Sequence, residues 1–118
     1  MTTHKNIVVD GVEYAPAQNM ANVDGMEYVI VRTYSAGVHA GFLEKQDGKL
    51  VILRNTRRIW YWVGAASLSQ MALSGVTCPD ECKFSVTIPK NTLTEAIETM
   101  PCTKEAMENI MGVPEWKA

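Results

Sequence analysis

The densest group of residues suited to chemistry lies between Arg54 and Ser67. Three of the chain's four arginines and two of its three tryptophans fall within the nine residues from Arg54 to Trp62. Guanidinium groups bind phosphate through paired hydrogen bonds, and aromatic rings stack on nucleobases. This pattern favours a compact site for a small anion. An alternative stays open, in which Trp60 and Trp62 fill the core or a subunit interface and the arginines pair with surface carboxylates.

Local charge and two glycine-containing segments support the anion site. Between Tyr28 and Ser67 there are six basic and two acidic residues, whereas the whole chain has a net charge of -2. The segment Gly64–Ser67 leads into an expected helix, whose free N–H groups would attract an anion. The segment Ser35–Gly37 would bring backbone N–H groups close to a ligand.

The three cysteines do not form a convincing metal site. Cys78 and Cys82 have a C-x3-C spacing, and Cys102 follows twenty residues later. A structural zinc ion needs four nitrogen or sulfur ligands, usually in close pairs, and only His4 or His39 could supply the fourth. We therefore expect reduced thiols, no metal and no cofactor.

Catalytic motifs are also missing from the sequence. The chain contains no GxSxG, P-loop or GxGxxG pattern, and its two histidines have no evident acid or nucleophile partner. We expect a protein that is not an enzyme, although a hydrolase built from scattered residues stays open as an alternative.

Length and composition indicate the class of protein. A chain of 118 residues with 47% hydrophobic residues fits one domain with a real core. The slightly acidic charge argues against a DNA or RNA duplex as the partner. No apolar run approaches the ~20 residues of a membrane span, and no signal peptide is evident. We expect an intracellular protein without a membrane partner.

The spacing of apolar residues predicts an α+β fold. Asp10-Gly11 between two short apolar runs predicts an N-terminal hairpin, followed by a linker over 17–25. We therefore divide the chain into residues 1–26, a hairpin and linker, and residues 27–118, one ligand-binding domain. An antiparallel sheet that begins as a four-stranded meander is expected from the segments Glu27–Tyr34, Val38–Lys45, Lys49–Asn55, Arg58–Val63, Lys83–Pro89 and Thr92–Met100.

Two short helices are expected on one side of this sheet. Ser67–Ser74 has a capping serine and is followed by Gly75, and Thr103–Met111 begins at a capping threonine. The segment Thr92–Met100 could also be helical, because it contains glutamate and alanine, but its threonines favour a strand.

Several segments together resemble a known phage family. These are EYVIVRTYSAGVHAGFLEK, ILRNTRRIWYWVGAASLSQMALSG, CKFSV and MGVPEW, between Glu27 and Trp116. They are similar to the first-described family of Thoeris anti-defence proteins, and RRIWYWVGAASLSQ is the most distinctive string.

The resemblance implies a sponge. Such proteins bind a cyclic ADP-ribose isomer, made by a TIR-domain protein on infection, and keep it from its effector without cleaving it. Members also sequester cyclic di- or trinucleotides of the CBASS defence in separate pockets. The resemblance further implies a homo-oligomer, from a dimer to a hexamer, with pockets between subunits, in the cytoplasm of the infected bacterial host.

The residue types then suggest ligand contacts. We expect Arg57 and Arg58 to bind phosphate, with only one of them in a given pocket, since neighbours on a strand face opposite sides. The remaining expected contacts are stacking by Trp62 or Phe84, a base or ribose contact by Asn91, and backbone or hydroxyl contacts by Ala36, Gly37 and Ser67. Two other functions stay open: an oligomeric accessory or structural phage protein without a ligand, and a small nucleotide-cleaving enzyme.

Overall fold

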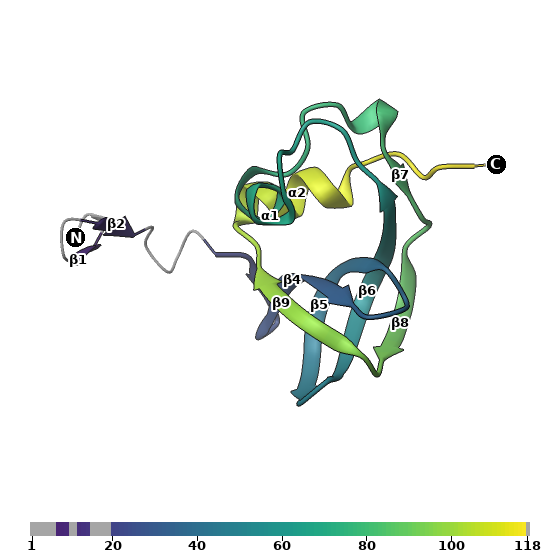
Figure 1. Cartoon of the computed structure of the whole chain (residues 1–118), viewed down its shortest axis with the longest axis horizontal. Coiled ribbons are helices and arrows are strands. Elements are labelled where there is room, and N and C mark those ends of the chain that lie inside the picture. Colours follow the sequence, from purple (N-terminus) through teal and green to yellow (C-terminus); the bar gives the residue numbers. More distant parts are fainter. Residues whose placement is uncertain (1–6, 10–11, 15–19, 118) are drawn as a thin grey trace.

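The computed structural model describes residues 7–9, 12–14 and 20–117. Within these residues the main sheet has seven strands, and two helices lie together beside it (Figure 1). The predicted α+β class, an antiparallel sheet with two short helices, is confirmed. The elements are β1 (Ile7–Val9), β2 (Val12–Tyr14), β3 (Asn22–Val23), β4 (Met26–Thr33), β5 (Val38–Asp47), β6 (Leu50–Tyr61), α1 (Leu68–Ser74), the 3-10 turn η2 (Pro79–Glu81), β7 (Lys83–Phe84), β8 (Ile88–Leu93), β9 (Ala96–Pro101) and α2 (Lys104–Met111).

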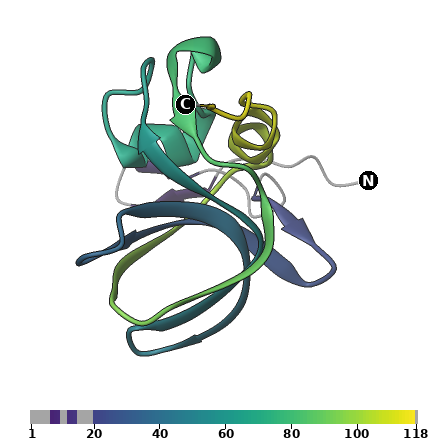
Figure 2. The same cartoon turned by 90° about the vertical axis from the view of Figure 1, so that its right-hand side faces the viewer.

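The sheet curls into a half-barrel. Strands β4, β5 and β6 form an antiparallel meander, β9 pairs with the free side of β4, and β8 pairs with β6. Figure 2 shows the sheet turning back on itself, with α1 and α2 outside the curl. The sheet therefore has a convex face under the helices and a concave face inside the curl.

Each face of the sheet has its own hydrophobic core. On β4, Tyr28 and Ile30 belong to the core that contains the helices, and Val29 and Val31 belong to the core inside the curl. This alternation follows from the two-residue period of a strand. Burial on both faces explains why β4 is a nearly continuous apolar run in the sequence.

The expected break after Asn55 is wrong. The two segments Lys49–Asn55 and Arg58–Val63 belong to one twelve-residue strand, β6. The strand bends rather than ends, because Asn55 has a positive φ of 46° and the register with β5 shifts between Ala40 and Phe42. The meander thus has three long strands instead of four.

The expected linker over 17–25 is wrong for its second half, whereas residues 17–19 lie outside the described residues. Asn22 and Val23 form β3, which pairs with the start of β4, and Ala21 is buried in the core with the helices. Asp24 and Gly25 form the turn, with positive φ angles of 54° and 79°. The structured domain therefore begins at about residue 20, before the boundary expected from composition.

The predicted N-terminal hairpin is confirmed at the level of the backbone. Strand β1 pairs with β2 in antiparallel register, with Val9 opposite Val12. The proposed turn residues Asp10-Gly11 lie outside the described residues.

The two C-terminal strand segments have different bounds from those expected. Lys83–Pro89 is divided between β7 and β8, and Thr92–Met100 is divided between β8 and β9 at Thr94-Glu95. The preference for strand over helix in Thr92–Met100 is confirmed. At Thr94-Glu95 the chain passes from pairing with β6 to pairing with β4, a change that local propensity does not encode. Strands β7 and β8 both pair with β6 and are separated by residues 85–87.

Both predicted helices are confirmed, with their caps. Ser67 Oγ accepts a hydrogen bond from Gln70 N at 3.1 Å, and Thr103 Oγ1 accepts one from Ala106 N at 3.1 Å. A capping hydroxyl of this kind satisfies an N–H that has no partner within the helix. No helix among the described residues is long and apolar enough to cross a membrane.

Candidate functional site

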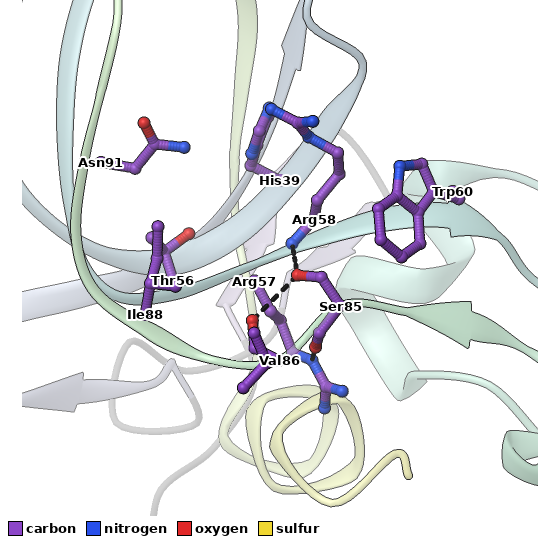
Figure 3. Close-up of a pocket in the computed structure, with 9 residues that line it drawn as sticks. All are labelled: His39, Thr56, Arg57, Arg58, Trp60, Ser85, Val86, Ile88 and Asn91. Carbon is purple, nitrogen blue, oxygen red and sulfur yellow. Dashed lines mark hydrogen bonds between the residues drawn. The ribbon is translucent and has the colours of Figure 1, made fainter. Parts of the chain in front are cut away.

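A pocket of about 220 Å³ opens on the concave face of the sheet, beyond the core inside the curl. Figure 3 shows the side chains around it. The pocket is lined by His39, Thr56, Arg57, Arg58, Trp60, Ser85, Val86, Ile88 and Asn91.

Strand pairing brings the polar residues of the pocket together. His39 on β5 lies opposite Arg58 on β6, and Asn91 on β8 lies opposite Leu53 on β6. His39 also lies opposite Val31, which belongs to the core inside the curl. Residues up to 52 positions apart in the sequence, His39 and Asn91, thus share one face of the sheet.

Arg58 supplies the cation of the pocket. Its side chain is exposed, and the ion pairs found among the described residues do not include it. Its backbone N–H donates to Ser85 Oγ at 2.7 Å, which fixes the strand next to the following segment. Figure 3 shows the Arg58 side chain next to His39 at the pocket. Because the guanidinium is exposed and is in none of these ion pairs, it is available to an anion.

His39 supplies a neutral imidazole. It is 1% exposed, and its Nε2 lies 2.9 Å from the carbonyl oxygen of Ala36. Burial lowers the pKa of His39, and the nearby positive charge of Arg58 lowers it further. The ring is therefore uncharged at neutral pH.

An exposed apolar rim borders the pocket. We call Trp60, Val86, Ile88 and Trp116 the aromatic rim; the first three line the pocket, and Trp116 packs edge-on against Trp60 with ring centroids 5.7 Å apart. Trp60 is 52% exposed and Val86 51%. The rim offers a ring face and aliphatic surface beside a cation.

The expected role of Arg57 in phosphate binding is wrong. Its guanidinium donates to the carbonyl oxygens of Ser85 at 2.9 Å, Ile110 at 3.0 Å and Val113 at 2.7 Å. In Figure 3 it points away from the pocket, toward α2. Arg57 is 4% exposed and holds the C-terminal end of α2 against the sheet, where a cation favourably meets free carbonyls. The expectation that Arg57 and Arg58 face opposite sides is confirmed.

The expected stacking by Phe84 is also wrong, because Phe84 has no exposed surface. Its ring instead packs under the Arg57 guanidinium, 5.3 Å from the ring centroid. Trp62 is half-buried against the core that contains the helices, and it does not line the pocket. Trp60 is the tryptophan that does.

The other expected contacts are distributed as follows. Asn91 lines the pocket. Ser67 caps α1 and is not at the pocket. Ala36 reaches the site only through its carbonyl bond to His39, and Gly37, with φ 83°, forms the turn beside it. Of the nine lining residues, the prediction includes Arg58, Asn91 and Arg57, the last with its guanidinium turned away from the pocket. It misses His39, Thr56, Trp60, Ser85, Val86 and Ile88.

The three thiols lie outside this pocket. Cys82 and Cys102 are buried, Cys78 is half-buried, and all three are free. Burial raises the pKa of Cys102 to about 12, so this thiol is protonated at neutral pH.

Comparison with known proteins gives a family. A family model described as a domain of unknown function (DUF6948) matches residues 26–110, most of the chain. The chain belongs to the DUF6948 family. The DUF6948 match includes every strand from β4 to β9 and all nine residues of the pocket. No curated protein and no solved structure matches the chain.

The chemistry available at the DUF6948 pocket is recognition of a polar anion with a flat or apolar part. Arg58 can neutralise a phosphate, Asn91 can both donate and accept, and Trp60 offers a ring for stacking. A pocket of about 220 Å³ is smaller than the ~300–1,000 Å³ of typical small-molecule sites. One chain therefore encloses less space than a typical small-molecule site.

Proposed function

We propose that this protein is a phage immune-evasion sponge that binds and sequesters, without cleaving, the cyclic ADP-ribose-type signals made by TIR proteins. It acts in the cytoplasm of the infected bacterial host. Cyclic oligonucleotides of CBASS are its second proposed ligand class. The observation that carries the proposal is the pocket in which Arg58, His39 and Asn91 meet beside Trp60.

The charge and aromatic content of the pocket support a nucleotide. A cyclic ADP-ribose contains a pyrophosphate, two riboses and an adenine. Arg58 would bind the pyrophosphate, and Trp60 would stack on the adenine. The small volume supports a pocket completed by a second copy of the chain, because the ligand is larger than the space that one chain encloses.

The hydrogen bonds of the pocket support binding without cleavage. Thr56 Oγ1 donates to the carbonyl oxygen of Ala40 at 2.7 Å, and Ser85 Oγ donates to that of Val86 at 2.9 Å. A hydroxyl becomes a nucleophile when a base takes its proton. Here both protons are directed at backbone carbonyls, and no base is found on either hydroxyl among the described residues.

The test is retention of intact ligand. The purified protein is incubated with cyclic ADP-ribose isomers, separated from free ligand, and heated to release what it holds. Recovery of unchanged ligand supports the sponge, whereas a new product indicates an enzyme. If no isomer is depleted, the proposal fails and an accessory or structural protein is favoured.

Arg58→Ala tests the site itself, with Arg32→Ala as the matched control. Arg32 is an exposed arginine that pairs with Glu98 on β9 and does not line the pocket. Loss of a charge-assisted hydrogen bond costs ~1.5–3 kcal/mol, or about ten- to a hundredfold in affinity. Calorimetric titration is expected to show this loss for Arg58→Ala alone. Equal affinities of both variants would exclude this pocket.

A further inference from the structure

His39 has one ring nitrogen whose bonding is fixed by the fold. A carbonyl oxygen only accepts, so the contact of 2.9 Å with Ala36 O requires that Nε2 carries the proton. In a neutral imidazole the other nitrogen, Nδ1, then has a free lone pair. The turn before β5 thereby sets the tautomer of a pocket residue.

The free nitrogen of His39 faces the pocket. Among residues 20–117, no hydrogen bond is found to Nδ1, and yet no fully buried polar side-chain atom lacks a partner. Nδ1 therefore keeps some accessible surface, and His39 lines the pocket, where this nitrogen can meet a ligand. A residue 1% exposed thus presents a single unsatisfied acceptor to whatever enters.

The surroundings of Nδ1 define the donor that it would meet. Arg58 is directly opposite His39 across the β5–β6 pair, and side chains of directly opposed residues are neighbours, so an anion on Arg58 would lie near the imidazole. In a nucleotide the ribose hydroxyls lie close to a phosphate, and the exocyclic amine of adenine lies much farther away. The group that reaches Nδ1 while a phosphate contacts Arg58 is therefore a sugar hydroxyl.

We propose that His39 is a specificity-determining residue that accepts a hydrogen bond through Nδ1 from a ribose hydroxyl of the nucleotide whose phosphate Arg58 binds. This inference rests on the proposed function, since it names the part of the ligand that one chain recognises. The pocket selects ribonucleotides over deoxyribonucleotides, because a deoxy sugar leaves the buried acceptor without a donor.

Two variants separate this role from a structural role of His39. In His39→Gln the amide nitrogen can still donate to Ala36 O, but no acceptor replaces Nδ1. In His39→Asn the shorter amide places an oxygen near the position of Nδ1 and loses the bond to Ala36. A purely structural histidine predicts that Gln is the milder change, and a ligand-reading histidine predicts that Asn preserves selectivity.

The probes are AMP, 2'-deoxy-AMP, 3'-deoxy-AMP and 2',3'-dideoxy-AMP, titrated against the full chain and followed by the imidazole nitrogen NMR signals. The wild type is expected to bind AMP about three- to tenfold more tightly than the dideoxy form. The chemical shift of Nδ1 is expected to change when AMP binds and to remain unchanged with the dideoxy form. His39→Gln is expected to lose the preference, and His39→Asn to keep part of it.

Three results would overturn the inference: no AMP binding, equal binding of AMP and its dideoxy form, or a preference that survives in His39→Gln. Failure of the proposed function gives a different result. If cyclic ADP-ribose is not retained but the preference for AMP and its loss in His39→Gln are seen, the sponge proposal fails and the role of His39 stands. If wild type and His39→Gln retain the cyclic ligand equally and neither prefers AMP, only the role of His39 fails.

Discussion

Arg57 and Arg58 are adjacent in sequence and differ in nearly every physical respect. Arg57 is buried, and four backbone carbonyls accept its hydrogen bonds, whereas Arg58 is exposed beside the pocket. The alternation of a strand predicts that only one of them can reach a ligand. Which one does so depends on α2, whose free C-terminal carbonyls attract the inward-facing guanidinium.

Arg57→Ala is expected to lower the free energy of unfolding by about 2–4 kcal/mol. A hydrogen bond to a charged donor contributes ~1.5–3 kcal/mol, and the truncation leaves buried carbonyl oxygens without their donor. Arg58→Ala is expected to change it by less than about 0.5 kcal/mol, as for other exposed sites. Urea unfolding of both variants measures the difference. Equal midpoints would show that Arg57 does not hold α2 to the sheet.

The buried imidazole of His39 makes stability depend on pH. Burial and the neighbouring charge of Arg58 lower the pKa of His39 in the folded state. Below about pH 6.5 the unfolded chain therefore binds a proton at this histidine more readily than the folded chain does. The free energy of unfolding is therefore expected to fall as the pH decreases from 7 toward 5. Urea titrations should show a smaller decrease for His39→Gln. The same slope in both proteins would contradict a neutral His39 in the folded state.

The sequence analysis selects Arg58 and Asn91 by their functional groups, and both line the pocket. His39 shows no sequence partner, since Ala36 contributes a backbone carbonyl and Arg58 becomes its neighbour only through strand pairing. Phe84 and Trp62 are aromatic like Trp60, and burial alone distinguishes their roles. Residue type thus indicates chemistry, and the long-range register decides which residues share a pocket.

At the scale of elements, the bend of β6 shapes the site. Gly41 on β5 lies so close to Thr56 that an added Cβ would be 2.6 Å from Thr56 Cβ and 3.0 Å from its Cα. This close approach accompanies the register shift between Ala40 and Phe42. Sequence patterning gives both helices and most of the strand segments, but it misses β3. A bent strand with arginines and an asparagine also resembles two strands with a turn between them.

Gly41→Ala is expected to lower the free energy of unfolding by about 1–3 kcal/mol, because the new methyl group meets backbone that can move only if β5 and β6 separate. Gly112→Ala is the matched control. Its φ of −87° suits alanine, and its Cβ would contact Glu108 O at 3.3 Å, so a smaller change is expected. Thermal melts of the two variants test this. Equal stability of the two variants would indicate that β5 and β6 can move apart at Gly41 and Thr56 without loss of stability.

At the scale of the whole molecule, the pocket is small and its rim is exposed. The aromatic rim stands exposed at the mouth of a pocket too small for a dinucleotide, and Lys83 lies over the ring of Trp116 at 5.2 Å. Aromatic residues are enriched at the centre of subunit interfaces, where they cover apolar surface and exclude water. A second copy packed on the rim would both bury these rings and close the pocket.

The protein is therefore expected to be at least a dimer at micromolar concentration without ligand, as measured by light scattering. Trp60→Glu is expected to shift it toward the monomer, because the rim would then carry a charge that loses its hydration on association. Tyr34→Glu is the matched control, since Tyr34 is an 80% exposed aromatic residue that follows β4 and does not line the pocket. A monomeric wild type would contradict the prediction outright. A dimer that tolerates Trp60→Glu but not Tyr34→Glu would place the interface at the turn that follows β4 and leave the pocket open to solvent.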